Sequence, residues 1–258
     1  MNTVDLELAT DSSEHYRREL AALYRAMSVL GWDDLIFTHI SAQIGDSPGH
    51  YLMNRLGALF GEMTPDRLEL VNENDGITPD WDGAVNPAGF NIHSALHHKG
   101  REDICWLVHL HSDAGVGVSC LEEGFLPLNQ TAMLVYEDIA YHSYEGVSLD
   151  QDERERLAVD LGDKNILILR NHGTLVAGKT CEEVFLRTYW YEKACQIQWG
   201  LGSRAARLPD KKIISVVTEQ ANDVMRTGGA RLAWNAMKRE IAAKMPDTNS
   251  WLILDDQD

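Results

Sequence analysis

Two histidines stand one residue apart at the end of an apolar stretch, in VHLHSDA over residues 108–114. If ICWLVHLH, residues 104–111, forms a buried strand, side chains two positions apart share a face, so His109 and His111 point the same way. Buried imidazole rings cost free energy unless a partner satisfies their nitrogens, and a divalent cation bound to both would do so. Loop carbonyls and hydroxyls are the alternative partners, so a metal site requires a third ligand.

The third candidate is His172, in the turn of NILILRNHGTLVAG over residues 165–178. Three neutral imidazoles suit Zn²⁺, and also Mn²⁺, Co²⁺, Fe²⁺ or Ni²⁺, and they leave a coordination position open for substrate or water. We therefore predict one divalent metal, with zinc as first choice. His93 and His97, four residues apart on a predicted helix, form a second pair, which one packed ring and one surface ring would also explain.

The elements that must position these histidines follow from periodicity, caps and turn residues. Asp11 with Glu14 resembles a helix start, and the apolar spacing continues to Gly31. Gly173 is expected to take a positive φ where the chain turns after His172. The remaining pattern predicts helices over 87–100, over 113–120, from 181 onward after a Thr180 and Glu183 capping box, and over about 213–245, with strands over 35–44, 51–54, 67–72, 104–111 and 138–142 and in the two apolar runs of 165–178.

Composition limits the class of protein. The chain has 258 residues, of which 44% are hydrophobic, and nothing resembles an interdomain linker, so we expect one domain over residues 1–258. The formal net charge of −17 disfavours nucleic-acid and membrane partners and favours a small-molecule substrate. Four widely spaced cysteines, an acidic amino terminus and no long apolar run predict a cytoplasmic protein with reduced thiols.

Three segments resemble the family of class II aldolases and adducin head domains. They are VHLHS at 108–112, LILRNHGTLVAG at 167–178 and CEEVFLRTYWYEKACQIQ at 181–198, and the resemblance runs from about residue 15 to about 205. It implies an α/β fold, a three-layer αβα domain with a central, largely antiparallel β-sheet flanked by helices. It also implies a homo-oligomer, most often a tetramer with active sites near subunit interfaces, and metal binding by His109, His111 and His172.

The resemblance fails at one position of catalytic importance. In the sugar-phosphate aldolases of this family a carboxylate four residues before a helical histidine serves as general base. That histidine corresponds to His93 here, and Gly89 stands in place of the carboxylate. The serines that bind phosphate are also absent, since residues 86–88 read Asn-Pro-Ala. We therefore expect a non-phosphorylated hydroxy-carbonyl substrate.

The general base must then come from elsewhere in the chain. The candidates are His142, Tyr141 and Tyr144, in the segment DIAYHSYEGV at 138–147. Asn171 and Gly89 are candidate substrate-binding positions, although Asn171 is better suited to fixing the turn around His172.

Three functions remain open on the sequence. The first is a metal-dependent carbon–carbon lyase of the aldolase type. The second is a non-catalytic binding or oligomerisation domain like the adducin head, because AGFNIHSAL at 88–96 and ACQIQ at 194–198 are closer to that branch. The third is a hydrolase with the HxHxDH pattern of metallo-β-lactamases, although Ala114 occupies the place of its last histidine.

Overall fold

The computed structural model describes residues 3–45, 49–72 and 84–254, with side chains from residue 13 onward. These residues form a seven-stranded sheet with the strand order β3-β2-β1-β4-β7-β6-β5. Every neighbouring pair is antiparallel except β5 and β6, which run parallel. The strands are β1 His39–Gln43, β2 His50–Asn54, β3 Leu68–Asn72, β4 Trp106–Leu110, β5 Ile139–His142, β6 Ile166–Leu169 and β7 Gly173–Gly178.

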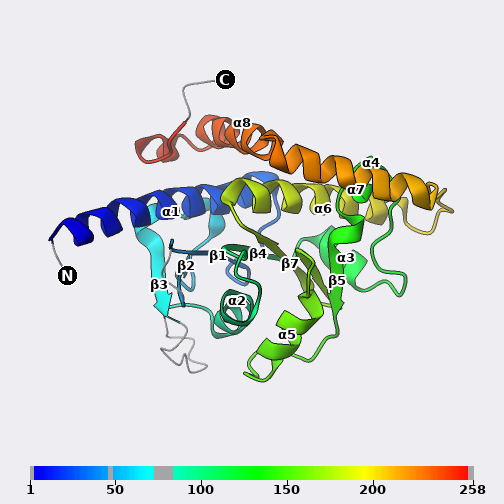
Figure 1. Cartoon of the computed structure of the whole chain (residues 1–258), viewed down its shortest axis with the longest axis horizontal. Coiled ribbons are helices and arrows are strands. Elements are labelled where there is room, and N and C mark those ends of the chain that lie inside the picture. Colours follow the sequence, from blue (N-terminus) through cyan, green and yellow to red (C-terminus); the bar gives the residue numbers. More distant parts are fainter. Residues whose placement is uncertain (1–2, 46–48, 73–83, 255–258) are drawn as a thin grey trace.

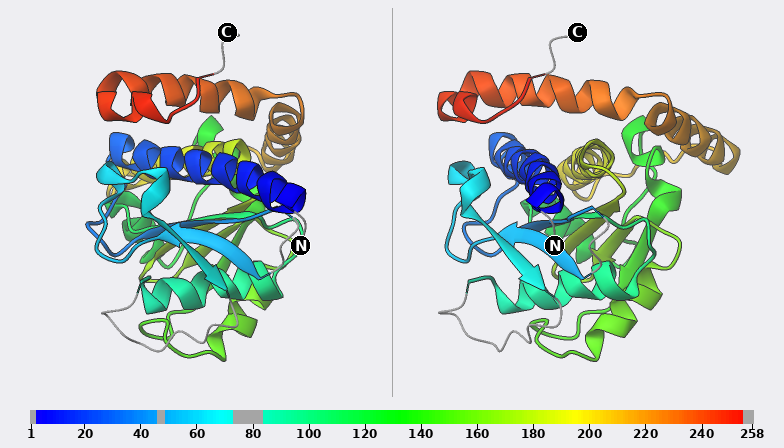
Figure 2. Two further views of the ribbon diagram at one scale, coloured as in Figure 1. Left: turned by 90° about the vertical axis from the view of Figure 1, so that its left-hand side faces the viewer. Right: turned by 60° about the vertical axis from the view of Figure 1, so that its left-hand side comes forward.

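Helices cover both faces of the sheet (Figure 1). Helices α1 and α6 pack on one face, and α2 and α5 on the other, which confirms the predicted three-layer αβα arrangement with a largely antiparallel sheet. Helices α7 and α8 lie outside α1 and α6, away from the sheet (Figure 2). The helices are α1 Thr3–Leu30, α2 Pro87–Lys99, α3 Asp113–Ser119, α4 Gln130–Met133, α5 Glu153–Leu161, α6 Cys181–Leu201, α7 Lys211–Arg226 and α8 Gly229–Lys244, with short 3₁₀ turns at Phe60–Glu62, Pro65–Arg67, Tyr136–Asp138 and Pro246–Ser250.

Local sequence signals set the ends of the helices beside the sheet. The Asn86 side chain accepts hydrogen bonds from the backbone N–H groups of the second and third residues of α2, Pro87 occupies the first position, and Gly100 ends the helix. The Thr180 hydroxyl accepts from the backbone N–H of Glu183 and begins α6. The structure thus confirms the predicted ends of these helices. They could be predicted because capping depends only on residues close in the sequence.

Two helices differ from the sequence prediction. The segment expected to form one helix over about 213–245 forms α7 and α8, because Gly228 adopts a left-handed φ of 93° that interrupts the helical hydrogen bonds. The first helix begins at Thr3 rather than near Asp11, so the predicted cap pair lies inside α1. Neither difference changes the sheet.

The central strands are the most buried part of the molecule. Every residue of β4, β6 and β7 is buried. One apolar cluster lies between the sheet and helices α1 and α6, and a second lies between the sheet and helices α2 and α5. Polar side chains at the ends of these strands are therefore held by rigid neighbours. Within the described residues, no helix is both long and apolar enough to span a bilayer.

Candidate metal centre

The predicted histidines come together where β4 ends beside the turn between β6 and β7. His109 lies on β4 opposite Leu175 of β7, His111 follows the last residue of β4, and His172 occupies the turn. One nitrogen of each ring lies within 4.8 Å of the others, a spacing that one metal ion can bridge. Ring centroids are 4.7 Å apart for His109 and His111 and 4.9 Å apart for each of them and His172. The structure thus assembles the three residues into one potential ligand set.

Two backbone features shape the turn that carries His172. Asn171 adopts a left-handed φ of 58°, and the backbone N–H of His172 donates to the carbonyl of Leu169 at 3.1 Å. The positive φ predicted at Gly173 is therefore wrong, since Asn171 supplies it. A Cβ atom at Gly173 would lie 2.4 Å from the Leu110 carbonyl oxygen and 2.9 Å from Cδ2 of His111. Glycine is required there for close approach to β4.

Hydrogen bonds fix the protonation pattern of two of the rings. Nδ1 of His109 lies 3.0 Å from the carbonyl oxygen of Thr174, and Nδ1 of His111 lies 3.1 Å from Oδ2 of Asp34. Both partners only accept, so each Nδ1 carries the proton and each Nε2 presents a lone pair. The two Nε2 atoms face each other at 2.8 Å. With no proton between them, this contact is unfavourable unless a cation binds both atoms, and the residues therefore fit a divalent metal.

Burial keeps the three imidazoles neutral. It lowers the pKa of His109 well below the usual value for histidine, and the neighbouring His111, His39 and His172 add to this effect. Burial lowers the pKa of His172 to about 4. It also lowers the pKa of His111, although Asp34 opposes this shift. Neutral rings are the form that binds metal, so protons do not compete strongly at neutral pH.

A cavity of about 420 Å³ opens beside the three histidines. Its apolar walls include Phe37, Ile92 and Val147, and the Tyr144 ring centroid lies 6.3 Å from that of His172. No lysine or arginine is among its described lining residues. The lining set is Asp34, Phe37, His39, Asn86, Ala88, Ile92, His109, His111, Tyr144, Gly146, Val147, Ser148 and His172. The cavity therefore offers room for a small organic molecule, and its described lining provides no cationic side chain.

The structure separates the three candidate bases. Tyr144 lines the cavity, whereas His142 and Tyr141 are not among its described lining residues. His142 is buried, with Nδ1 2.7 Å from Oδ2 of Asp160 and Nε2 3.6 Å from Oε1 of Glu153, and these carboxylates, Glu153 foremost, raise its pKa. The Tyr141 hydroxyl accepts a hydrogen bond from the backbone N–H of Phe125 at 3.0 Å.

The two candidate substrate-binding positions also lie away from the cavity surface. Asn171 is exposed and shapes the turn, and Gly89 lies behind His39. A Cβ atom at Gly89 would stand 2.5 Å from Cδ2 and 2.7 Å from Nε2 of His39. The His39 ring therefore occupies the space that any side chain at position 89 would need. No sequence motif marks His39 or Asp34. His39 is found from the sheet register, in which it pairs with His109, and Asp34 is found from its contact with Nδ1 of His111.

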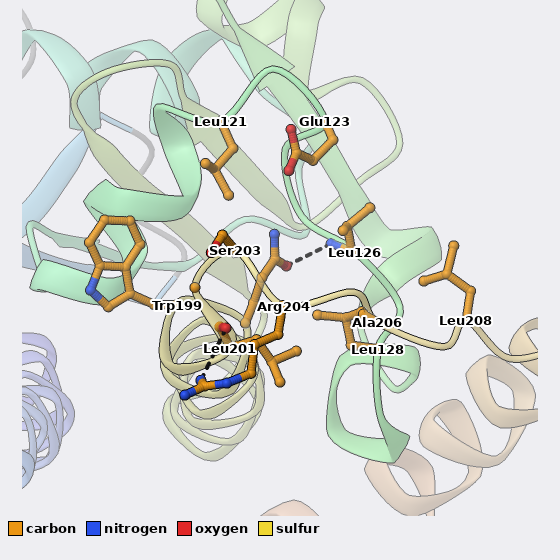
Figure 3. Close-up of a pocket in the computed structure, with 12 residues that line it drawn as sticks. Leu121, Glu123, Leu126, Leu128, Trp199, Leu201, Ser203, Arg204, Ala206 and Leu208 are labelled. Atoms are coloured by element: carbon orange, nitrogen blue, oxygen red, sulfur yellow. Dashed lines mark hydrogen bonds between the residues drawn. The ribbon is translucent and has the colours of Figure 1, made fainter.

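A larger cavity of about 610 Å³ lies elsewhere, between the loop over residues 121–128 and the carboxyl end of α6 (Figure 3). Leucine is the most frequent residue in its walls, and Gln198, which also lines it, accepts from the backbone N–H of Leu126 and donates to the carbonyl of Gly124. Glu123 and Arg204 are its charged lining residues. It holds no histidine and no buried acid among its described lining residues, so it offers none of the metal-ligating groups found at the histidine centre.

Comparison with known proteins agrees with this geometry. The family model described as "Class II Aldolase and Adducin N-terminal domain" matches residues 18–199. The chain belongs to this family. The match contains all three histidines of the centre and the strand and turn that carry them. Membership also removes the metallo-β-lactamase interpretation of the HLHSDA segment.

Relatives of this class II aldolase-type chain include both branches of the family. A protein of Caulobacter vibrioides named as a candidate class 2 aldolase is 43% identical over 233 residues, 89% of this chain and 90% of its own length. Alpha-adducin of Mus musculus is 37% identical over 195 residues, 74% of this chain and 26% of adducin. Among solved structures, an aldolase II superfamily protein of Pseudomonas syringae is 38% identical with a TM-score of 0.84, covering 92% of this chain and 96% of its own. L-fuculose 1-phosphate aldolase of Glaciozyma antarctica is 25% identical with a TM-score of 0.74, covering 93% and 94%.

Proposed function

We propose that this class II aldolase-family protein is a metal-dependent carbon–carbon lyase of the aldolase type, acting on a small non-phosphorylated hydroxy-carbonyl compound. The observation that carries the proposal is the 2.8 Å contact between the Nε2 atoms of His109 and His111 beside His172, which the acceptors at the two Nδ1 atoms leave without a proton. These three residues would hold the divalent ion, with zinc as first choice. A bound divalent ion would supply a Lewis acid that polarises carbonyl and hydroxyl oxygens of the substrate.

The protein groups around the cavity have distinct roles in this proposal. Thr174 and Asp34 orient the two facing rings through their Nδ1 atoms. The apolar walls exclude water and strengthen polar contacts inside the cavity. Tyr144, the one of the three candidate bases among the described lining residues, would hold or move a proton through its hydroxyl. Residues 86–88, which read Asn-Pro-Ala in place of the serines that bind phosphate in sugar-phosphate aldolases, support a substrate without phosphate.

A second candidate function is a non-catalytic domain like the adducin head. Gly89 supports it, because glycine supplies neither a metal ligand nor a base at the position where sugar-phosphate aldolases carry a carboxylate. The two functions differ in their requirement for metal. An oligomerisation domain needs no cation at the histidine centre, whereas the proposed lyase requires one.

We also propose a homotetramer that works in the cytoplasm, with a small molecule as its partner and without nucleic acid or membrane. The net charge of −17 supports the absence of polyanionic partners. Light scattering is expected to give about four times the mass of one chain, and a monomeric mass would contradict the tetramer.

Elemental analysis of untagged protein purified without chelator tests the metal site directly. We expect about one equivalent of metal in the parent and none in His109→Ala or His172→Ala. His98→Ala is the matched control, because this exposed histidine lies outside the centre and its loss should leave the metal content unchanged. Full metal content in both centre variants would refute the proposed ligands. A metal-loaded parent is then assayed for cleavage of non-phosphorylated aldols.

A further inference from the structure

Four buried or half-buried polar side chains form a continuous hydrogen-bonded chain behind the cavity. Nδ1 of His39 lies 2.7 Å from Nε2 of His93, whose Nδ1 contacts Oγ of Ser41. The same Oγ lies 2.7 Å from Nε2 of His97, and Nδ1 of His97 lies 3.4 Å from the carbonyl oxygen of Ile104. Strand β1 supplies His39 and Ser41, and helix α2 supplies the two other histidines. The chain therefore links a backbone carbonyl to the cavity wall.

The Ile104 carbonyl sets the direction of every proton in the chain. A carbonyl only accepts, so Nδ1 of His97 carries a proton and its Nε2 accepts from the Ser41 hydroxyl. The Ser41 oxygen in turn accepts from Nδ1–H of His93. Nε2 of His93 is then unprotonated and accepts from Nδ1–H of His39. The last nitrogen, Nε2 of His39, is left with a lone pair.

This last nitrogen is the free end of the chain. No described residue forms a hydrogen bond with Nε2 of His39, and His39 lines the cavity. The ring cannot turn easily, because it stacks on His109 with centroids 4.7 Å apart and planes at 23°, and it fills the space beside Gly89. A fixed acceptor thus stands next to the metal ligands.

We propose that His39 is a substrate-binding residue whose unprotonated Nε2 accepts a hydrogen bond from a substrate hydroxyl, and that Ser41, His93 and His97 are positioning residues that hold this tautomer. The inference rests on the proposed function, because the hydroxyl belongs to a molecule bound beside the histidine centre. It narrows the substrate class to hydroxy-carbonyl compounds that carry a further hydroxyl group, one that donates to His39.

Two hydroxamates separate the metal site from the His39 contact. Acetohydroxamate and glycolohydroxamate present the same two chelating oxygens, and only glycolohydroxamate carries an additional hydroxyl. On zinc-loaded protein we expect glycolohydroxamate to bind about tenfold more tightly, the effect of one hydrogen bond to an otherwise unpaired buried acceptor. The variant His39→Phe keeps an aromatic ring of similar size over His109. In this variant the two hydroxamates should bind with about equal affinity, and acetohydroxamate should bind as it does to the parent.

The tautomer gives a second readout that a purely structural role would not produce. Nitrogen-15 spectra of histidine-labelled, zinc-loaded protein are expected to show His39 protonated at Nδ1. Ser41→Ala removes the link between His93 and His97, so we expect a mixture of His39 tautomers and a loss of the glycolohydroxamate preference. Ser94→Ala is the matched control, because Ser94 is an equally buried serine whose hydroxyl donates to the Asn91 carbonyl outside the chain.

The outcomes distinguish a failure of the proposed metal-dependent function from a failure of the proposed role of His39. If neither hydroxamate binds and zinc is not retained, the proposed function fails. If both bind the parent equally, or His39→Phe keeps the tenfold preference, the metal site stands and the role of His39 is refuted. A His39 ring protonated at Nε2 in the parent would also overturn the inference.

Discussion

Replacement of Gly89 by alanine tests whether the His39 ring occupies the space that a side chain at position 89 would need. A Cβ atom there would lie 2.5 Å from Cδ2 and 2.7 Å from Nε2 of His39, about 1 Å inside an ordinary contact of 3.5–4.0 Å. The ring has little room to retreat, because it stacks on His109 and hydrogen-bonds to His93. Overpacking of this kind costs about 1–3 kcal/mol.

The higher helix propensity of alanine relative to glycine partly offsets this overpacking cost. Gly89 is the third residue of α2, where alanine is favoured over glycine by up to about 1 kcal/mol. The expected net effect on Gly89→Ala is a destabilisation of roughly 1 kcal/mol, or a fall in Tm of about 3 °C. Gly200→Ala is the matched control, because Gly200 is also helical and nothing lies within 4 Å of its Cβ position. That variant should be stabilised by about 0.5–1 kcal/mol.

A double-mutant cycle tests whether the destabilisation by Gly89→Ala comes from the His39 ring. In a His39→Ala background the obstacle is absent, so Gly89→Ala should stabilise, and the coupling between the two sites should be about 1–3 kcal/mol. Urea unfolding of metal-free protein at one fixed protein concentration compares all four species without a contribution from ligand and at equal conditions for assembly. If Gly89→Ala stabilises the parent as Gly200→Ala does, His39 does not occupy this space and the argument for its role loses its geometric basis.

Two further substitutions test other parts of the site. Gly173→Ala would place a Cβ 2.4 Å from the Leu110 carbonyl oxygen and should lower the free energy of unfolding by about 2 kcal/mol or more. The same Cβ would lie 2.9 Å from Cδ2 of His111, so the variant should also bind metal more weakly. An unchanged Tm and metal affinity would contradict the close approach. Burial raises the pKa of the Glu192 carboxyl from 4.5 to about 7, so this group binds more protons in the folded state than in the unfolded state between these values, and its own contribution to the free energy of unfolding should fall by roughly 3 kcal/mol as the pH rises through them. The buried histidines with lowered pKa values contribute in the opposite direction, so the measurement is the difference between parent and Glu192→Gln in urea unfolding at pH 5 and at pH 8. The same pH dependence in parent and variant would refute the Glu192 contribution.

The sequence predicted that His109, His111 and His172 would lie together because its signals are local. The alternation of a strand places His109 and His111 on one face, and a turn between two apolar runs marks His172. The caps of α2 and α6 are equally local, which is why their boundaries were predicted closely. Each of these features depends on residues within a few positions of one another.

The parts that the sequence could not predict depend on distant neighbours. His39 matters because β1 lies beside β4 in the sheet, an adjacency that brings residues 39 and 109 together across seventy positions. Asp34 reaches His111 for the same reason. The positive φ was assigned to Gly173 although Asn171 adopts it, because both residue types tolerate that conformation and only the approach of β4 decides between them.

The missing carboxylate at position 89 favours a non-catalytic domain, but the contact between His109 and His111 favours a bound cation. Without a cation, the 2.8 Å contact between the Nε2 atoms of His109 and His111 is favourable only if one ring gains a second proton and donates it to the other. Asp34 favours such a charge on His111, but burial outweighs it and lowers the pKa of that ring, and burial lowers the pKa of His109 still further. A divalent cation satisfies both lone pairs without a buried imidazolium. The proposed metal would therefore stabilise this arrangement, and His39, in the space beside Gly89, keeps a polar side chain at the cavity wall.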